Sequence, residues 1–112
     1  DPGSQTYNDL FETAVRMYPN SEAANLNAAA SAITRGDYAS AQRYLEKAGN
    51  SPQAIYTRGN LKASQGDFET ALQHFQRAAK LKVASAPDAI AQTRKLVERR
   101  QRQGRHTAGK QQ

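Results

Sequence analysis

Residues able to carry out catalysis are few in this sequence, and their spacing gathers none of them into a catalytic set. The two histidines, His74 and His106, are far apart, and the acidic residues occur singly rather than as pairs suited to general acid–base chemistry. Cysteine is absent, which excludes disulfides, thiol catalysis and cysteine-based zinc sites. The sequence also lacks glycine-rich phosphate loops and the HExxH and GxSxG motifs. We therefore predict that the protein is not an enzyme and uses no metal ion or cofactor.

The formal net charge of +6 comes entirely from the C-terminal end of the chain. Residues 1–93 carry nine basic and nine acidic groups, whereas residues 94–112 carry seven basic groups and one acid, Glu98. Such a segment can contact the phosphates of a nucleic acid or an anionic membrane surface. The candidates for these contacts are Arg94, Lys95, Arg99, Arg100, Arg102 and Arg105. No aromatic residue lies among them to stack on bases, and cations near a helix C-terminus are favoured by the helix dipole alone.

An internal repeat indicates which elements position the polar residues of the body. Residues 35–41, RGDYASA, align with residues 65–71, QGDFETA, thirty positions later. Both segments read x-G-D-aromatic-x-x-A. The alignment extends to three further pairs of residues: Ala29 and Gly59, Leu45 and Phe75, Ala48 and Ala78. The chain therefore contains two copies of one structural unit.

Each part of the repeat has a physical role. The glycine adopts the left-handed conformation that ends a helix, and the aspartate after it caps the next helix through its side-chain oxygen. The aromatic residue and the alanine three positions later place a large and a small side chain on one helix face. Small residues at Ala29 and Gly59 allow two antiparallel helices to approach closely. The unit is therefore predicted to be helix, tight turn, helix.

The sequence predicts an all-α domain over residues 5–103, preceded by a linker or cleavage remnant at 1–4 and followed by a disordered basic tail at 104–112. Ser51-Pro52 is a typical helix start, as is Pro87 with its early acid. Since the end of a helical stack needs a cap, we assign that role to the last helix. The expected helices are 5–18, 21–35, 38–48, 52–65, 68–82 and 87–102. No apolar run reaches the roughly 18–20 residues of a membrane span.

This pattern resembles the tetratricopeptide repeat (TPR) family over residues 5–83. The segment containing Tyr7, Phe11 and Ala14 fits the second helix of an incomplete repeat, closed by Pro19. The resemblance implies a right-handed stack of antiparallel helix pairs, an α-solenoid of about two and a half repeats with a C-terminal capping helix. The spacing of thirty residues is shorter than the usual repeat of about 34.

The second unit departs from the family pattern in the composition of its first helix. Arg58 and Lys62 stand there where large apolar residues are usual. We therefore expect this helix to be less buried than its counterpart, or slightly rotated.

The resemblance also implies a binding site. In TPR proteins the first helix of each unit lines a concave groove in which a peptide or a partner's helix docks. The corresponding residues here are Leu26, Asn27, Ala30, Ile33, Tyr56, Thr57, Asn60 and Ala63. Asparagines can bind a peptide backbone, and Tyr56 can serve as an aromatic anchor. The alternatives are that these positions form an ordinary helix surface, or that the terminal helix fills the groove. We interpret His74 as a surface or groove-edge residue.

The leading prediction is thus a scaffold or adaptor segment of a larger protein, binding another protein in a TPR-like groove. The alternative is a nucleic-acid-binding accessory module that uses the basic helix and tail. Self-association through exposed stacking faces is a third hypothesis. Short TPR stretches also resemble segments of bacterial envelope proteins, so the resemblance leaves cytoplasm and bacterial periplasm both open as locations.

Overall fold

A computed structural model describes the backbone of residues 5–110 and the side chains of residues 9–104. The described residues form six helices and no strand: α1 (Gln5–Met17), α2 (Glu22–Arg35), α3 (Tyr38–Ala48), α4 (Pro52–Ser64), α5 (Phe68–Lys80) and α6 (Ala86–Lys110). The all-α prediction is confirmed, and the first five helices begin and end within two residues of their expected bounds. The predicted linker at 1–4 lies outside the described residues.

The last helix is longer than the sequence indicated. Helix α6 continues to Lys110, so the segment 104–110, which we expected to be disordered, is helical. No proline follows Pro87, and nothing in the sequence of this segment therefore forces the helix to stop. Residues 111–112 lie outside the described part of the chain.

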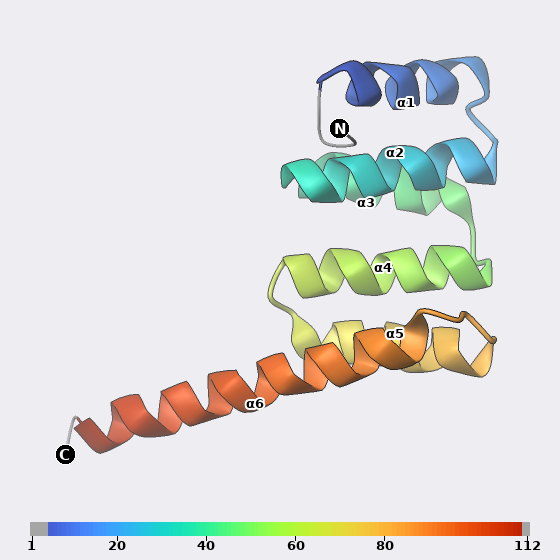
Figure 1. Ribbon diagram of the computed structural model, residues 1–112. Helices are drawn as coiled ribbons and strands as arrows, with labels where there is room; N and C mark the ends of the chain where they lie inside the picture. Colours follow the sequence, from blue (N-terminus) through green and yellow to red (C-terminus); the bar gives the residue numbers. More distant parts are fainter. Residues whose placement is uncertain (1–4, 111–112) are drawn as a thin grey trace.

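The helices pack mainly against their neighbours in sequence. The most extensive contacts join α2 to α3 and α4 to α5, and smaller ones join α2 and α3 to α4. Helix α1 packs on α2, and α6 packs on α5. Figure 1 shows α2, α4 and the first half of α6 one below the other, with α3 and α5 behind them. The second half of α6 extends past the rest of the molecule.

The two Gly-Asp turns have the predicted geometry. Gly36 and Gly66 adopt left-handed conformations with φ of 79° and 82°. The carboxylate of Asp37 accepts a hydrogen bond from the Ser40 backbone N–H at 3.2 Å, and that of Asp67 accepts one from the Thr70 N–H at 3.3 Å. Hydrogen bonds from Ser40 also lower the pKa of Asp37. Each turn therefore ends one helix and caps the next, which makes α2–α3 and α4–α5 two copies of one hairpin.

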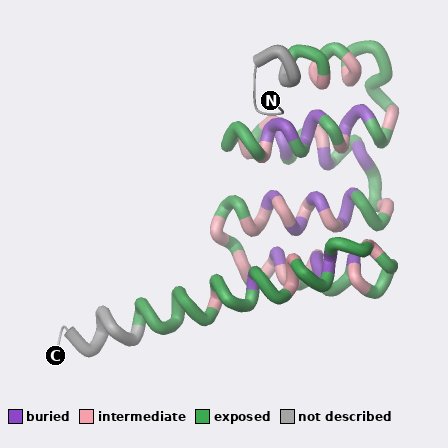
Figure 2. The backbone as a smooth tube through the Cα atoms, viewed as in Figure 1, coloured by how far each residue is buried: buried purple, intermediate pink, exposed green. Residues whose placement is uncertain are grey.

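The core is thin and built largely from alanine, as Figure 2 indicates by the narrow buried strips along the central helices. The largest buried side chain is Phe75, which is 2% exposed. Its ring lies directly over Gly59, where an added Cβ would be 2.5 Å from Phe75 Cε1. The small residue predicted at this position is therefore required by the aromatic residue opposite.

Helix α4 is buried to about the same extent as α2, with five buried residues against six, and a slight rotation of α4 stays a prediction. Helix α4 contributes the buried residues Ala54, Ile55, Thr57, Gly59 and Leu61. Arg58 occurs in it for a different reason, because its guanidinium donates hydrogen bonds to the carbonyl oxygens of Leu45, at 3.0 Å, and Gly49. It donates a further bond to Asn50 Oδ1 at 3.0 Å. Arg58 therefore caps the C-terminus of α3, whose last carbonyls have no partners within the helix.

Candidate partner-binding groove

Three hollows follow one another along the face formed by α1, α2, α4 and α6. The first, of about 140 Å³, lies beside α1 and α2 and is lined by Phe11 and Asn27 among others. The second, of about 400 Å³, lies between α2 and α4. The third, of about 390 Å³, lies between α4 and the first half of α6.

Neighbouring hollows share lining residues. Ala30 and Thr34 line both the first and the second hollow. Asn60 and Ala63 line both the second and the third. A segment lying across the helices can therefore contact all three hollows, which together we call the groove.

The structure places seven of the eight predicted groove residues on this surface. They are Asn27, Ala30, Ile33, Tyr56, Thr57, Asn60 and Ala63. Leu26 lies elsewhere, since it is half-buried against the core cluster that includes Ala29 and Leu45. The sequence pattern could not tell whether Leu26 faces the groove or the core. Successive residues on a helix differ in direction by only about 100°, so a residue at the edge of one face can belong to the next.

Two of these residues have less freedom to bind a partner than their types suggested. The Thr57 side chain is buried, and its hydroxyl already donates a hydrogen bond to the Gln53 carbonyl oxygen at 2.9 Å. The Tyr56 ring packs on Phe75, with 5.4 Å between the ring centroids. Tyr56 therefore forms part of the groove wall, and Asn60 and Ala63 are the more accessible positions of α4.

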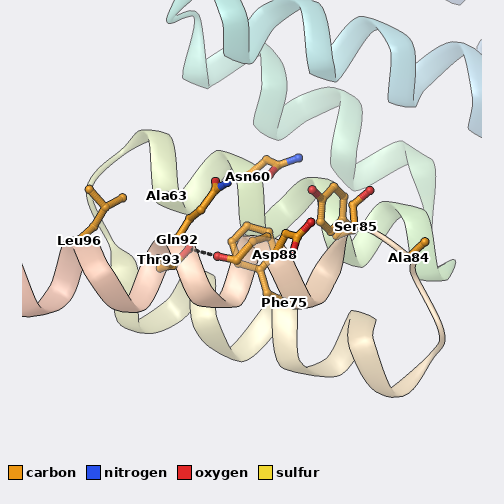
Figure 3. Close-up of a pocket in the computed structure, with 11 residues that line it drawn as sticks. Asn60, Ala63, Phe75, Ala84, Ser85, Asp88, Gln92, Thr93 and Leu96 are labelled. Atoms are coloured by element: carbon orange, nitrogen blue, oxygen red, sulfur yellow. Dashed lines mark hydrogen bonds between the residues drawn. The ribbon is translucent and has the colours of Figure 1, made fainter.

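Sequence reasoning missed one wall of the groove, which is formed by α6. Asp88, Gln92 and Leu96 line the third hollow across from Asn60 and Ala63 (Figure 3). These three residues recur at every fourth position, a spacing that places them on one helix face and could have indicated this surface. The terminal helix borders the groove and leaves a hollow between itself and α4.

The groove surface is polar but almost uncharged. Its floor contains the small residues Ala30, Ala63 and Ala89, which allow a partner's backbone to approach closely. Amide groups supply both hydrogen-bond donors and acceptors along its length: Asn27, Gln53, Asn60 and Gln92. Asp88 is the one charged residue among those that line it. Within the described part of the chain no cluster of three or more potential metal ligands occurs.

The six basic residues singled out from the sequence do not form one surface. The Arg100 guanidinium lies 4.3 Å from the centroid of the Phe68 ring and donates a hydrogen bond to the Gly66 carbonyl oxygen at 2.9 Å. Four others have exposed side chains: Arg94, Lys95, Arg99 and Arg102. The side chain of Arg105 lies outside the described residues.

His74 is half-buried on α5 and does not line the groove. Burial lowers its pKa below the usual 6.5, and the positive charges of Arg58, Lys62 and Arg77 lower it further, with a partly opposing effect from Asp67. The folded state therefore favours the neutral imidazole more than the unfolded chain does.

This shift predicts a loss of stability in mild acid. The stabilising contribution of neutral His74 is complete above the unfolded pKa of about 6.5 and falls as the pH drops below it. We expect the Tm of the protein to decrease between pH 7.5 and 5.5, and to decrease less in a His74→Gln variant. Thermal unfolding followed by circular dichroism at several pH values measures both. Parallel pH profiles for the two proteins would contradict the prediction.

Comparison with protein-family models, curated proteins and solved structures finds no match to this chain. The resemblance to TPR proteins therefore rests on the sequence motifs quoted above. Among the described residues, no helix has both the length and the apolar character needed to cross a membrane.

Proposed function

We propose that the protein is a non-catalytic interaction module whose helix pairs form a TPR-like solenoid, and that it binds a segment of another protein in the groove. The observation that carries this proposal is the row of three hollows along one face, in which neighbours share Ala30 and Thr34 at one junction and Asn60 and Ala63 at the next. The shared residues lie on α2 and α4, so a segment that crosses these two helices passes from one hollow to the next.

The chemistry of the groove selects the kind of partner. Extended peptides carry a backbone donor and acceptor at each residue, and these match the side-chain amides along the groove. The small residues of the floor leave room for a backbone. Asp88 adds a preference for a cation near the α6 end, and no groove cation is present to bind a carboxylate. The expected ligand is therefore an extended, uncharged or weakly basic peptide segment.

A matched pair of substitutions tests this function. Peptides that bind the intact chain are first selected from a random twelve-residue library. Their affinities for the intact chain and for the Ala63→Arg and Ala39→Arg variants are then measured by fluorescence anisotropy. Ala63 lies at the junction of the two larger hollows, whereas Ala39 is exposed on α3 away from the groove. We expect Ala63→Arg to weaken binding at least about tenfold, or about 1.4 kcal/mol, and Ala39→Arg to leave the affinity unchanged.

Two results would argue against the groove. If no peptide is recovered with an affinity better than about 100 μM, the surface is not a peptide-binding site. If selected peptides bind the intact chain and Ala63→Arg equally well, they bind elsewhere. Circular dichroism melts of both variants control for folding, since Ala63 is half-buried and Ala39 is exposed.

A further inference from the structure

The exposed basic residues of α6 form a second surface, and none of them lines the groove. Arg94, Lys95, Arg99 and Arg102 all have exposed side chains. At about 100° per residue they lie within an arc of about 140° on one side of the helix. Glu98 lies in the same arc, which leaves three net positive charges. We call these four basic residues the basic face.

Arg100 lies on the opposite side of the helix and determines the direction of the basic face. Its guanidinium stacks on the Phe68 ring and donates to the Gly66 carbonyl oxygen, so it holds α6 against the turn between α4 and α5. Thr93, on the same side as Arg100, is 3% exposed. Because these two residues face the body, the basic face is turned away from it. The second half of α6 extends past the other helices (Figure 1).

The cations of the basic face have no acidic partners. Among the described residues, the one ion pair joins Arg35 to Asp37, so Glu98 neutralises none of the four by direct contact. Lys95 and Arg99 are four positions apart, a spacing at which like charges destabilise a helix. A bound polyanion would relieve this repulsion.

The spacing of the four cations and the types of residue near them indicate which polyanion the basic face fits. Four cations over nine residues of helix correspond to one charge per roughly 3–4 Å, close to the spacing of about 3.4 Å per phosphate along one strand of a duplex. The opposite side of α6 carries Thr93, Leu96, Val97 and Arg100. A membrane-surface helix would need this side free and apolar, but here Thr93 is buried against the body and the charged Arg100 is bound to the α4–α5 turn. Single strands are usually bound with aromatic stacking, and no aromatic residue follows Phe75.

We propose that the basic face binds the phosphate backbone of a nucleic-acid duplex. The contact is electrostatic and independent of base sequence. Arg100 acts as a positioning residue that keeps the other four directed away from the α4–α5 turn. None of the four lines the groove.

The test compares two quadruple variants of the full chain that lose the same number of positive charges. In the first, the basic face is neutralised: Arg94→Gln, Lys95→Gln, Arg99→Gln and Arg102→Gln. In the second, four exposed cations of the body are replaced: Arg16→Gln, Arg43→Gln, Lys47→Gln and Lys80→Gln. Anisotropy of a labelled 20-base-pair DNA duplex gives the affinities, and circular dichroism confirms that both variants are folded.

We expect the intact chain to bind the duplex at 50 mM salt and to lose about 100-fold in affinity by 200 mM, as roughly four phosphate contacts require. The basic-face variant should lose at least about tenfold at 50 mM, and the body variant less than about threefold. No duplex binding by the intact chain, or equal losses in the two variants, overturns the proposal. Binding to vesicles containing phosphatidylserine without binding to the duplex would also overturn it and assign the face to membranes.

If the quadruple variant does not fold, Arg99→Glu alone provides the test. Arg99 is exposed, and its reversal should weaken duplex binding by about tenfold while leaving the Tm unchanged. An unchanged affinity in this variant contradicts the proposal equally.

Discussion

Replacing Gly59 with alanine is expected to destabilise the protein by about 1 kcal/mol, although alanine is the better helix former. The new methyl group would lie 2.5 Å from Cε1 and 2.6 Å from Cδ1 of Phe75, well inside the contact distance of about 3.5–4.0 Å between carbon atoms. The Phe75 ring is 2% exposed and packs on the Tyr56 ring, so any shift of Phe75 that relieves the contact disturbs this packing. Overpacking of this kind costs about 1–3 kcal/mol and outweighs the gain in helix propensity of about 1 kcal/mol.

The corresponding pair in the first unit provides the control for this prediction. There Ala29 faces Leu45, and both are buried without conflict. The double variant Gly59→Ala/Phe75→Leu reproduces that pair, and we expect it to be more stable than the sum of the single changes by at least about 1 kcal/mol. Urea unfolding of the four proteins measures the coupling. A Gly59→Ala variant more stable than the intact chain would show that the ring moves aside.

Replacing Asn25 with aspartate at pH 7 is expected to destabilise the protein by about 3 kcal/mol. Asn25 is completely buried, and its Nδ2 group donates hydrogen bonds to the carbonyl oxygens of Pro19, at 3.0 Å, and Ser21, at 2.8 Å. The aspartate has the same shape but no donor, so a buried carboxylate oxygen would face two carbonyl oxygens. The turn between α1 and α2 would lose its internal support.

The matched control is Asn27→Asp on the same helix, where the side chain is exposed and the change should cost less than about 0.5 kcal/mol. The Asn25→Asp defect should also shrink as the pH falls towards the unfolded pKa of about 3.9, because burial raises the pKa of the introduced carboxyl in the folded state. Urea unfolding at pH 7 and pH 4.5 measures this. Equal effects of the two substitutions would indicate that the α1–α2 turn opens readily.

The sequence predicted the features of the fold that depend on neighbouring residues. The Gly-Asp turns, the capping serine Ser51 and the alanine-rich faces each affect residues only a few positions away in the sequence. Their residue types therefore suffice to place α2 to α5. The small residue at Gly59 was also predicted, because the repeat aligns it with Ala29. Handedness and the TPR-like stacking remain predictions.

Features that depend on packing between distant segments could not be predicted in this way. Arg58 appeared to be an anomaly in a helix that should be apolar, and only the position of α3 reveals that it binds the carbonyl oxygens there. Arg100 belonged to a uniform basic stretch until the proximity of Phe68 separated it from its neighbours. The α6 wall of the groove was missed for the same reason, since its residues acquire their role from α4 opposite.

The Arg58 bonds also bear on how the molecule unfolds. In helical repeats, total stability is a sum of the intrinsic stability of each hairpin and a coupling term between neighbours, and weak coupling lets hairpins open one at a time. Here a side chain of the second hairpin completes the last turn of the first, and the Tyr38 hydroxyl donates in the other direction to the Ser64 carbonyl oxygen at 3.1 Å. Neither hairpin keeps all its hydrogen bonds when the other opens. We therefore expect the region from α2 to α5 to melt as a single cooperative unit. Among the described residues, α1 packs chiefly on α2.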